Sequence, residues 1–267
     1  MEADLRLAER VHRSMIPRSE RRGDLEVVCR FTPMHGVGGD YASVFFQTDT
    51  HVVASICDVS GHGIAAALLA SRVNSFVLNM APRAVHPCEV GGALNAFICH
   101  NFEETNLFLT FFCLFLDLES QSLLYSGFGH PPVLLYSKRD GRVTQVDSEN
   151  AMIGIDEDGT QNCSMLRVPF EPGDRLIMYT DGLSEARNAA GEFLDVGGLK
   201  RLFQDTLHLS VEDGVADIFQ RIEAFRDGSP ADDDQLLLAL GFLGGESQTG
   251  AIAPQPDRPR RRGSPHI

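Results

Sequence analysis

Acidic residues at the ends of apolar strands are the most informative feature of this chain. Four segments place aspartates at a strand end or beside a glycine, and a fifth segment offers a histidine instead. They are residues 37–41, 58–63, 179–182 and 232–234, with 129–130 as the histidine segment. Aspartates that converge from distant parts of a chain repel one another unless a positive group lies between them. Divalent cations that prefer oxygen ligands would supply that charge, so the pattern indicates metal-assisted chemistry.

Asp58 is the strongest single candidate among these aspartates. It ends a short apolar strand, and the small residues after it would let a ligand approach closely beside a helix N-terminus. A plain strand-to-helix turn would use the same residues. Asp40 and Asp181 would each suit a turn if taken alone, and the triplet 232–234 alone would suit a solvated acidic turn. Together they favour ligation, and a set of oxygens without companion Cys or His suits Mg²⁺ or Mn²⁺ better than zinc.

Other catalytic motifs find no support in the sequence. His62 and His130 are flanked by glycine, so they are either loop-positioning residues or weak acid/base candidates. The remaining histidines form no metal-ligand spacing. The chain contains no GxSxG, Walker or GxGxxG motif, which leaves serine hydrolase, nucleotide triphosphatase and dinucleotide-binding functions without support. The six cysteines show no CxxC pairing, so we expect free thiols rather than a disulfide framework or a zinc site.

The net charge and the lengths of the apolar runs limit which classes of partner and which cellular location we expect. The net charge of -14 argues against a nucleic-acid or anionic-membrane partner. No apolar run approaches the roughly 20 residues that span a bilayer, and no leader opens the chain, so we expect a cytoplasmic protein. Residues 245–267 are rich in Pro and Gly and carry the basic run 258–262, which predicts a disordered tail.

The periodicity of apolar residues predicts both helices and strands. Helices are expected over residues 2–16, 63–80, 87–102, 196–205 and 211–225, the last capped by Ser210. Strands are expected over residues 26–31, 40–47, 52–57, 109–117, 122–127, 133–136, 142–146, 164–168, 174–180 and 235–242. Most connections between strands are too short for parallel crossovers, so the pattern favours an α+β fold with antiparallel sheet and segregated helices.

The N-terminal helix stands apart from the rest of the chain. Its Leu7, Val11 and Met15 share one face that has no partner in its own segment, and Pro17 separates it from the first strand. We expect a regulatory or dimerising element that could join two copies of the chain. The alternative is that it packs onto the domain as one more surface helix.

The motifs together resemble one family. They are Val37-Gly38-Gly39-Asp40-Tyr41, Asp58-Val59-Ser60-Gly61-His62-Gly63, Ser126-Gly127-Phe128-Gly129-His130-Pro131-Pro132, Pro172-Gly173-Asp174 through Tyr179-Thr180-Asp181-Gly182, and the closing aspartates. In this order, over roughly residues 24–243, they resemble the metal-dependent serine/threonine protein phosphatases of the sporulation stage II protein E type, the bacterial branch of the type 2C phosphatases. The resemblance implies an αββα sandwich with metals at one end of its two antiparallel sheets. The phosphatase domain would span 24–244, between an N-terminal segment 1–23 and the tail 245–267.

The resemblance also implies roles for individual residues. Asp58 would bridge two Mn²⁺ or Mg²⁺ ions, Val59 would lend its backbone carbonyl, and Asp40 would act largely through water. Asp181 would complete the site with one aspartate of the triplet. Asp233 aligns best with the family's Asp pair, while Asp232 and Asp234 remain alternatives through a slip of one residue. Asp58 and Asp181 are the expected catalytic residues.

Two departures from the family pattern affect this interpretation. The wider type 2C family has a histidine two residues after the bridging aspartate, thought to protonate the leaving group, where this chain has Ser60. That leaves the acid unidentified. Leu236 replaces a smaller residue after the Asp pair, which affects strand packing at most.

The expected activity is hydrolysis of phosphoserine or phosphothreonine on a regulatory protein, such as an anti-sigma-factor antagonist. Two ions would lower the pKa of a shared water so that hydroxide attacks the phosphorus. One alternative is a catalytically silent member that uses the fold for binding or sensing. Another is a two-metal hydrolase of small phosphoesters, which would use the same residues on a different substrate.

Overall fold

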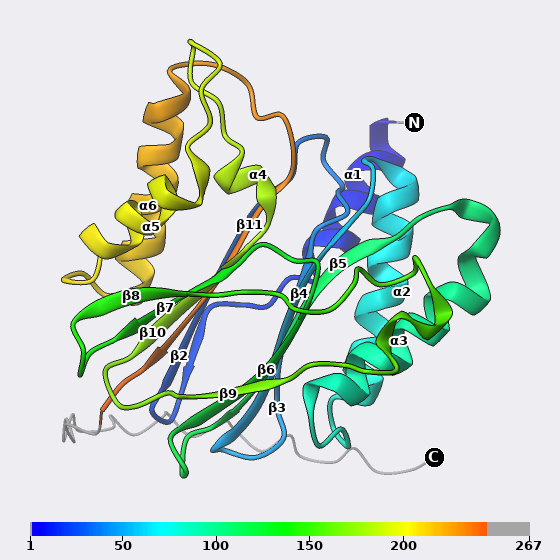
Figure 1. Ribbon diagram of the computed structural model, residues 1–267. Helices are drawn as coiled ribbons and strands as arrows, with labels where there is room; N and C mark the ends of the chain where they lie inside the picture. Colours follow the sequence, from blue (N-terminus) through cyan, green and yellow to red (C-terminus); the bar gives the residue numbers. More distant parts are fainter. Residues whose placement is uncertain (1, 245–267) are drawn as a thin grey trace, which may run out of the picture.

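Two antiparallel sheets lie face to face in the computed structural model, which describes residues 2–244 (Figure 1). The first sheet has the order β1-β2-β11-β10-β7-β8, with bounds Glu20–Arg22, Leu25–Thr32, Gln235–Phe242, Arg175–Tyr179, Val133–Ser137 and Arg142–Val146. The second has the order β3-β4-β5-β6-β9, with bounds Tyr41–Phe46, His51–Val59, Leu109–Asp117, Ser122–Phe128 and Leu166–Pro169. The α+β prediction and the αββα sandwich are confirmed. The predicted tail 245–267 lies outside the described residues.

Helices cover the outer face of each sheet. The helices α2 (Ile64–Met80) and α3 (Pro87–Phe102) pack on the second sheet, and α5 (Asp195–Asp205) and α6 (Val211–Arg226) pack on the first (Figure 1). Three short helices, α4 (Asp181–Ser184), η1 (Glu103–Thr105) and η2 (Glu157–Thr160), lie in connections. Within residues 2–244, none of the helices combines the length and apolar character needed to cross a bilayer.

The strand β4 shows how the sequence dictates this layering. Its residues 52, 54 and 56 face the core between the sheets, and its residues 53, 57 and 59 face the helices α2 and α3. Successive side chains of a strand point to opposite faces, so a strand covered on both sides needs apolar residues at nearly every position. The nearly continuous apolar run was therefore a correct sign of burial on both faces, and it fixes Asp58 at a covered strand end.

The element boundaries follow local signals closely. The main differences concern α1, β1, α4 and the strand β9, which begins at Leu166 rather than at residue 164. The helix α6 begins after Ser210, whose hydroxyl accepts a hydrogen bond from the Asp213 N–H at 3.0 Å. The first helix, α1, spans Glu2–Arg13 rather than 2–16. Strand β1 forms in a charged segment whose three side chains are all exposed, so no burial pattern could reveal it. Asp181 begins the helix α4 rather than sitting in an open turn.

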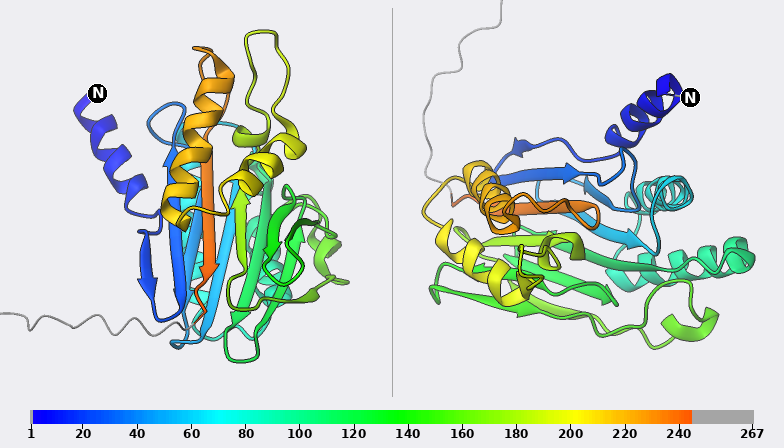
Figure 2. Two further views of the ribbon diagram at one scale, coloured as in Figure 1. Left: turned by 90° about the vertical axis from the view of Figure 1, so that its left-hand side faces the viewer. Right: turned by 90° about the horizontal axis from the view of Figure 1, so that it is seen from above.

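The helix α1 stands at one edge of the sandwich, beside β1 and β2 (Figure 2). Leu7 and Val11 are 53% and 57% exposed, whereas His12 is 3% exposed and Ile16, just beyond the helix, packs against the core between the sheets. The helix therefore packs on the domain through one side and leaves its apolar face open on the other. Self-association through that face remains a prediction.

The prediction that the cysteines are free is wrong for one pair. Cys88, near the start of α3, is joined by a disulfide to Cys163, just before β9, across 75 residues of sequence. Cys29, Cys57, Cys99 and Cys113 are free thiols. The pairing depends on how α3 packs against the segment before β9, and no local spacing of cysteines marks such a contact.

Candidate metal centre

Three aspartates from both sheets converge at one end of the sandwich. Asp58 lies near the end of β4, Asp181 follows β10, and Asp233 precedes β11, which pairs with β10. Burial and the charges of Asp181 and Asp233 raise the pKa of Asp58 to about 8. Burial and the charge of Asp233 raise the pKa of Asp181 to about 6. Such shifts arise when carboxylates are crowded away from water, and a cation between them would relieve the repulsion.

Asp40 lies behind this group and is held by the protein. It is 2% exposed, and the Thr180 hydroxyl donates a hydrogen bond of 2.6 Å to Asp40 Oδ2. The same hydroxyl accepts a 3.1 Å hydrogen bond from the Leu236 N–H, which ties Asp40 to β11. Burial, followed by the charge of Asp58, raises the pKa of Asp40 well above its usual value. One of the two carboxylate oxygens of Asp40 is therefore already engaged by a side chain of the protein.

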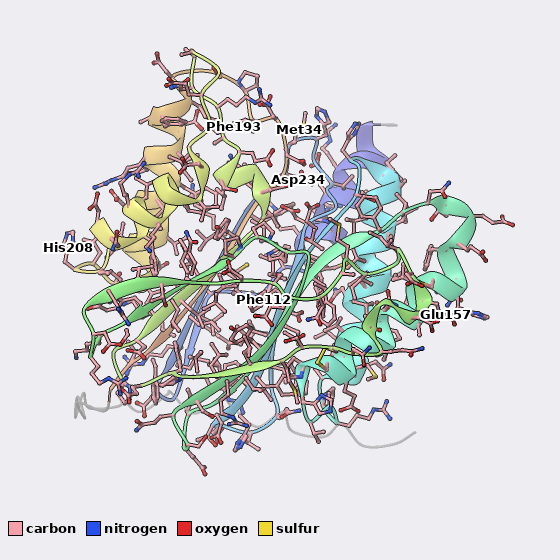
Figure 3. The ribbon with its side chains drawn as sticks, viewed as in Figure 1. Met34, Phe112, Glu157, Phe193, His208 and Asp234 are labelled. Carbon is pink, nitrogen blue, oxygen red and sulfur yellow. A yellow bond between two sulfur atoms is a disulfide. The ribbon has the colours of Figure 1, made fainter. Side chains whose placement is uncertain are left out.

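The three neighbouring aspartates 232–234 have different surroundings. Asp232 is exposed and pairs with Arg187 at 3.5 Å. Asp234 is buried, and its carboxylate accepts hydrogen bonds from Met34 N–H at 2.7 Å and Gly39 N–H at 3.0 Å. Figure 3 shows Asp234 and Met34 close together at this end of the sandwich. Asp233 is the member whose charge raises the pKa of both Asp58 and Asp181, so the arrangement favours Asp233 as the ligand.

These differences predict distinct effects of three substitutions. Asp233→Asn should weaken Mn²⁺ binding about 10- to 100-fold with little loss of stability, as expected when one ligand or its support is removed. Asp234→Asn should instead lower the free energy of unfolding by about 1–3 kcal/mol, because two buried N–H groups lose a charged acceptor. Asp232→Asn, at an exposed pair, should change neither property measurably. Calorimetric Mn²⁺ titration and urea unfolding of the three variants check this, and a metal-binding defect confined to Asp232→Asn would assign the ligand to that residue.

The backbone carbonyl of Val59 lies beside the loop that carries Asp40. Val59 is fully buried, and its N–H donates a 3.4 Å hydrogen bond to the Gly39 carbonyl. A Cβ at position 39 would lie 2.9 Å from the Val59 carbonyl oxygen. The predicted ligand oxygen therefore belongs to the same end of the sandwich as the aspartates.

Gly182 allows Asp181 and the aspartate triplet to approach each other. A Cβ at position 182 would lie 1.9 Å from the Asp234 carbonyl oxygen, a distance that no side chain tolerates. The Gln235 side chain also donates to the Gly182 carbonyl at 3.1 Å. The glycine after Asp181 is thus required by backbone contact between the two segments.

The glycine-flanked histidines have different surroundings. His130 is 4% exposed, its Nδ1 lies 2.8 Å from the Thr110 hydroxyl, and burial lowers its pKa to about 3. A neutral, buried imidazole suits a positioning role rather than proton transfer. His62 is exposed and its ring lies 6.3 Å from that of His35, centroid to centroid. The spacing of histidines in the sequence did not predict this contact between His35 and His62. The position of His35, just before the Gly38-Gly39-Asp40 turn, was the only feature of the sequence that placed it near the aspartates.

The residues fit divalent cations that keep much of their hydration. Among residues 2–244, no group of three or more His, Cys, Asp or Glu side chains is arranged to hold an ion by itself. Mg²⁺ in proteins keeps several waters and is commonly held by one or two carboxylates, so a site shared between few carboxylates suits it. The oxygen-only donors and the raised pKa values of Asp58 and Asp181 agree with that kind of ion.

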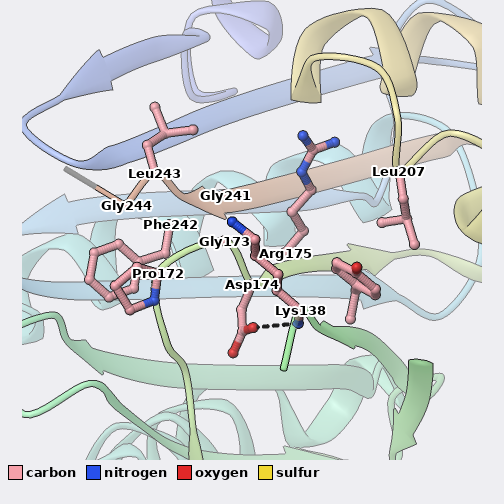
Figure 4. Close-up of a pocket in the computed structure, with 11 residues that line it drawn as sticks. Lys138, Pro172, Gly173, Asp174, Arg175, Leu207, Gly241, Phe242, Leu243 and Gly244 are labelled. Atoms are coloured by element: carbon pink, nitrogen blue, oxygen red, sulfur yellow. Dashed lines mark hydrogen bonds between the residues drawn. The ribbon is translucent and has the colours of Figure 1, made fainter. Parts of the chain in front are cut away.

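A separate pocket lies at the opposite end of the strands, away from the aspartates. Its volume is about 640 Å³, and Lys138, Asp174 and Arg175 are among its lining residues (Figure 4). The buried Asp174 carboxylate already accepts hydrogen bonds of 2.8 Å from the Lys138 and Glu171 N–H groups. Asp174 therefore stabilises a turn, and none of the predicted site residues lines this pocket.

Comparisons with known proteins identify the family to which this chain belongs. The chain matches the family model described as stage II sporulation protein E (SpoIIE) over residues 48–242. It is 24% identical over 242 residues to the phosphoserine phosphatase RsbU of Bacillus subtilis (strain 168), covering 89% of this chain and 70% of that protein. Its fold matches the SiaA-PP2C domain of Pseudomonas aeruginosa with a TM-score of 0.78 at 18% identity, covering 90% and 96% of the two chains. It matches RsbX, solved in complex with magnesium, with a TM-score of 0.62 at 16% identity, covering 84% and 98%. The chain therefore belongs to the stage II sporulation protein E family of PP2C-type serine/threonine phosphatase domains.

Proposed function

We propose that this protein hydrolyses phosphoserine or phosphothreonine on a regulatory protein, using two Mn²⁺ or Mg²⁺ ions held by Asp58, Asp181, Asp233 and the Val59 carbonyl. Asp40 would contribute through water. The observation that carries the proposal is the convergence of Asp58, Asp181 and Asp233 from both sheets, with the pKa of Asp58 raised to about 8 by burial and by its acidic neighbours. Perturbed carboxylates gathered at one end of a domain are typical of catalytic sites.

The chain's own residues would prepare the site. When bound, the ions supply an activated water and neutralise phosphoryl oxygens as charge develops. Asp58 would supply the carboxylate of the second sheet, and Thr180 fixes Asp40 through its 2.6 Å hydrogen bond. Asp234 holds the loop 33–40 by its two backbone hydrogen bonds. These contacts would hold the Asp40 carboxylate in place before metal binds, which would reduce the reorganisation needed on binding.

The proposed substrate is a phosphorylated protein of the anti-sigma-factor antagonist type, in the cytoplasm. Support comes from the family resemblance and from RsbU, the relative named as a phosphoserine phosphatase. The catalytic unit would be residues 24–244. The ratio kcat/KM should be higher for a phosphorylated antagonist protein than for an aryl phosphate if this assignment is right. Equal or lower values for the phosphoprotein would instead favour a hydrolase of small phosphoesters.

The proposed activity predicts a strict requirement for added metal. With Mn²⁺, the purified protein should release phosphate from a phosphoserine peptide and from an aryl phosphate, and chelation should abolish both activities because no thiolate or imidazole retains the ion. Phosphate release is followed colorimetrically, with metal restored after chelation as the control. Turnover that persists after exhaustive chelation would contradict the two-metal proposal, and no turnover under any condition, despite Mn²⁺ binding, would favour a silent binding module.

A further inference from the structure

One buried histidine outside the predicted site contacts the loop that carries Asp40. His12, on α1, is 3% exposed, and its Nε2 lies 2.8 Å from the Gly38 carbonyl oxygen. A carbonyl oxygen can only accept, so Nε2 carries the proton and donates. The other ring nitrogen, Nδ1, is buried and has no hydrogen-bond partner among the described residues. The His12 side chain therefore makes its hydrogen bond to the Gly38 carbonyl oxygen.

The loop 33–40, between β2 and β3, is held by two side chains. Asp234 accepts hydrogen bonds from the Met34 and Gly39 N–H groups, and His12 donates one to the Gly38 carbonyl. The fit is tight, since a Cβ at position 38 would lie 1.7 Å from Asp234 Oδ2. Asp40 follows two residues after Gly38, so the position of its carboxylate depends on where this loop is held.

The ring of His12 is itself fixed by the sheet. It lies 5.2 Å from the Phe31 ring, centroid to centroid, and Phe31 pairs with Leu236 in the adjacent strand β11. Leu236 donates its N–H to Thr180, whose hydroxyl holds Asp40. Two connected routes thus join His12 to Asp40, one through the loop backbone and one through β2 and β11.

We propose that His12 is a positioning residue for Asp40: its hydrogen bond to the Gly38 carbonyl fixes the loop that places the Asp40 carboxylate at the metal centre. The inference rests on the proposed function where it concerns metal binding. Its structural part, that His12 restrains the loop 33–40, holds for the metal-free protein as well. It gives the N-terminal segment a role in the site that its sequence did not indicate.

Two substitutions separate the hydrogen bond from the packing of the ring. His12→Phe keeps a ring against Phe31 but removes the donor. His12→Gln removes the ring, while its side-chain amide can place an N–H near the position of Nε2. His208→Ala, at an exposed histidine remote from the loop (Figure 3), serves as the control. A merely structural role for the ring would make His12→Gln the more damaging change.

The first measurement is amide hydrogen exchange across residues 34–40 in the metal-free, full-length protein. His12→Phe should exchange about tenfold faster than wild type there, as expected for the loss of one hydrogen bond, while His12→Gln and His208→Ala stay near wild type. Unchanged exchange in His12→Phe overturns the proposal, whatever the protein catalyses.

The second measurement is Mn²⁺ affinity by calorimetry, with a double-mutant cycle. His12→Phe should bind Mn²⁺ about 10- to 100-fold more weakly than wild type, with rescue by His12→Gln. In an Asp40→Asn background the same substitution should have little further effect, because His12 acts through Asp40. Fully additive effects would overturn the assigned route. Failure of wild type to bind Mn²⁺ would instead contradict the proposed metal centre, and hydrogen exchange would still decide the role of His12.

Discussion

Replacing Asp58 with asparagine is expected to lower phosphate release by more than about 100-fold at saturating Mn²⁺, the scale seen when one preorganised electrostatic group is removed from an active site. The amide cannot supply the negative charge that the proposed two-metal centre requires at this position. The fold should survive, since asparagine has nearly the same shape. Steady-state rates with an aryl phosphate and circular dichroism of the variant measure both properties. A rate within a few-fold of wild type would show that the metal centre lies elsewhere.

The same substitution should change how stability depends on pH. The folded-state pKa of Asp58 is about 8, against an ordinary value of 3.8, so folding favours the protonated carboxyl. Its contribution to stability is full below about pH 4 and is lost as the pH rises through about 8. Metal-free Asp58→Asn should therefore lose less stability than wild type between these pH values. Urea unfolding of both proteins at pH 5 and pH 8 tests the sign, and a steeper loss in the variant would contradict it.

Replacing Gly182 with alanine should damage both the fold and the metal centre. The new Cβ would lie 1.9 Å from the Asp234 carbonyl oxygen, and backbone on both sides must move to relieve the contact. Forced overpacking of this kind costs about 1–3 kcal/mol of unfolding free energy. Because the displaced segments carry Asp181 and Asp233, Mn²⁺ affinity should also fall by about 10- to 100-fold.

Gly92→Ala is the matched control for this glycine substitution. Gly92 lies inside α3, where a Cβ would have its nearest neighbour, the Thr160 hydroxyl, at an ordinary 3.8 Å. Alanine there should raise the unfolding free energy by up to about 1 kcal/mol through helix propensity. Thermal unfolding and calorimetric titration of both variants distinguish the outcomes. If Gly182→Ala binds Mn²⁺ as wild type does, the segments around Asp181 and Asp233 do not form the site.

Local sequence patterns predicted most of the fold, because the burial of most helices and strands is reflected in the spacing of their apolar residues. The strand β4 shows both faces buried, and α6 carries its cap at Ser210. The strand β1 was missed because only its backbone pairs, leaving its side chains in solvent. The Cys88–Cys163 disulfide was missed because two distant segments must pack before the sulfurs meet.

The candidate site could be predicted in outline but not in detail. Strand ends and glycines pointed to Asp40, Asp58 and Asp181, because those signals are local. Within the triplet 232–234 the family alignment favoured Asp233 over its neighbours. The tertiary contacts of Asp232 with Arg187 and of Asp234 with Met34 and Gly39 separate those two from it in the fold. His12 gave no signal at all, since its role depends on a contact across 26 residues of sequence.

The course of β11 has a practical consequence for attaching this protein to a surface. Asp233 precedes the strand, and its eight residues run to Phe242 at the other end of the sandwich. A rise of about 3.4 Å for each of the seven steps from Gln235 to Phe242 separates the two ends by about 24 Å. An affinity handle or fluorophore placed after Gly244 would therefore leave the aspartate end facing solution, whereas one joined to α1 would lie beside the loop 33–40. Immobilised-protein assays with large phosphoprotein substrates should use the attachment after Gly244.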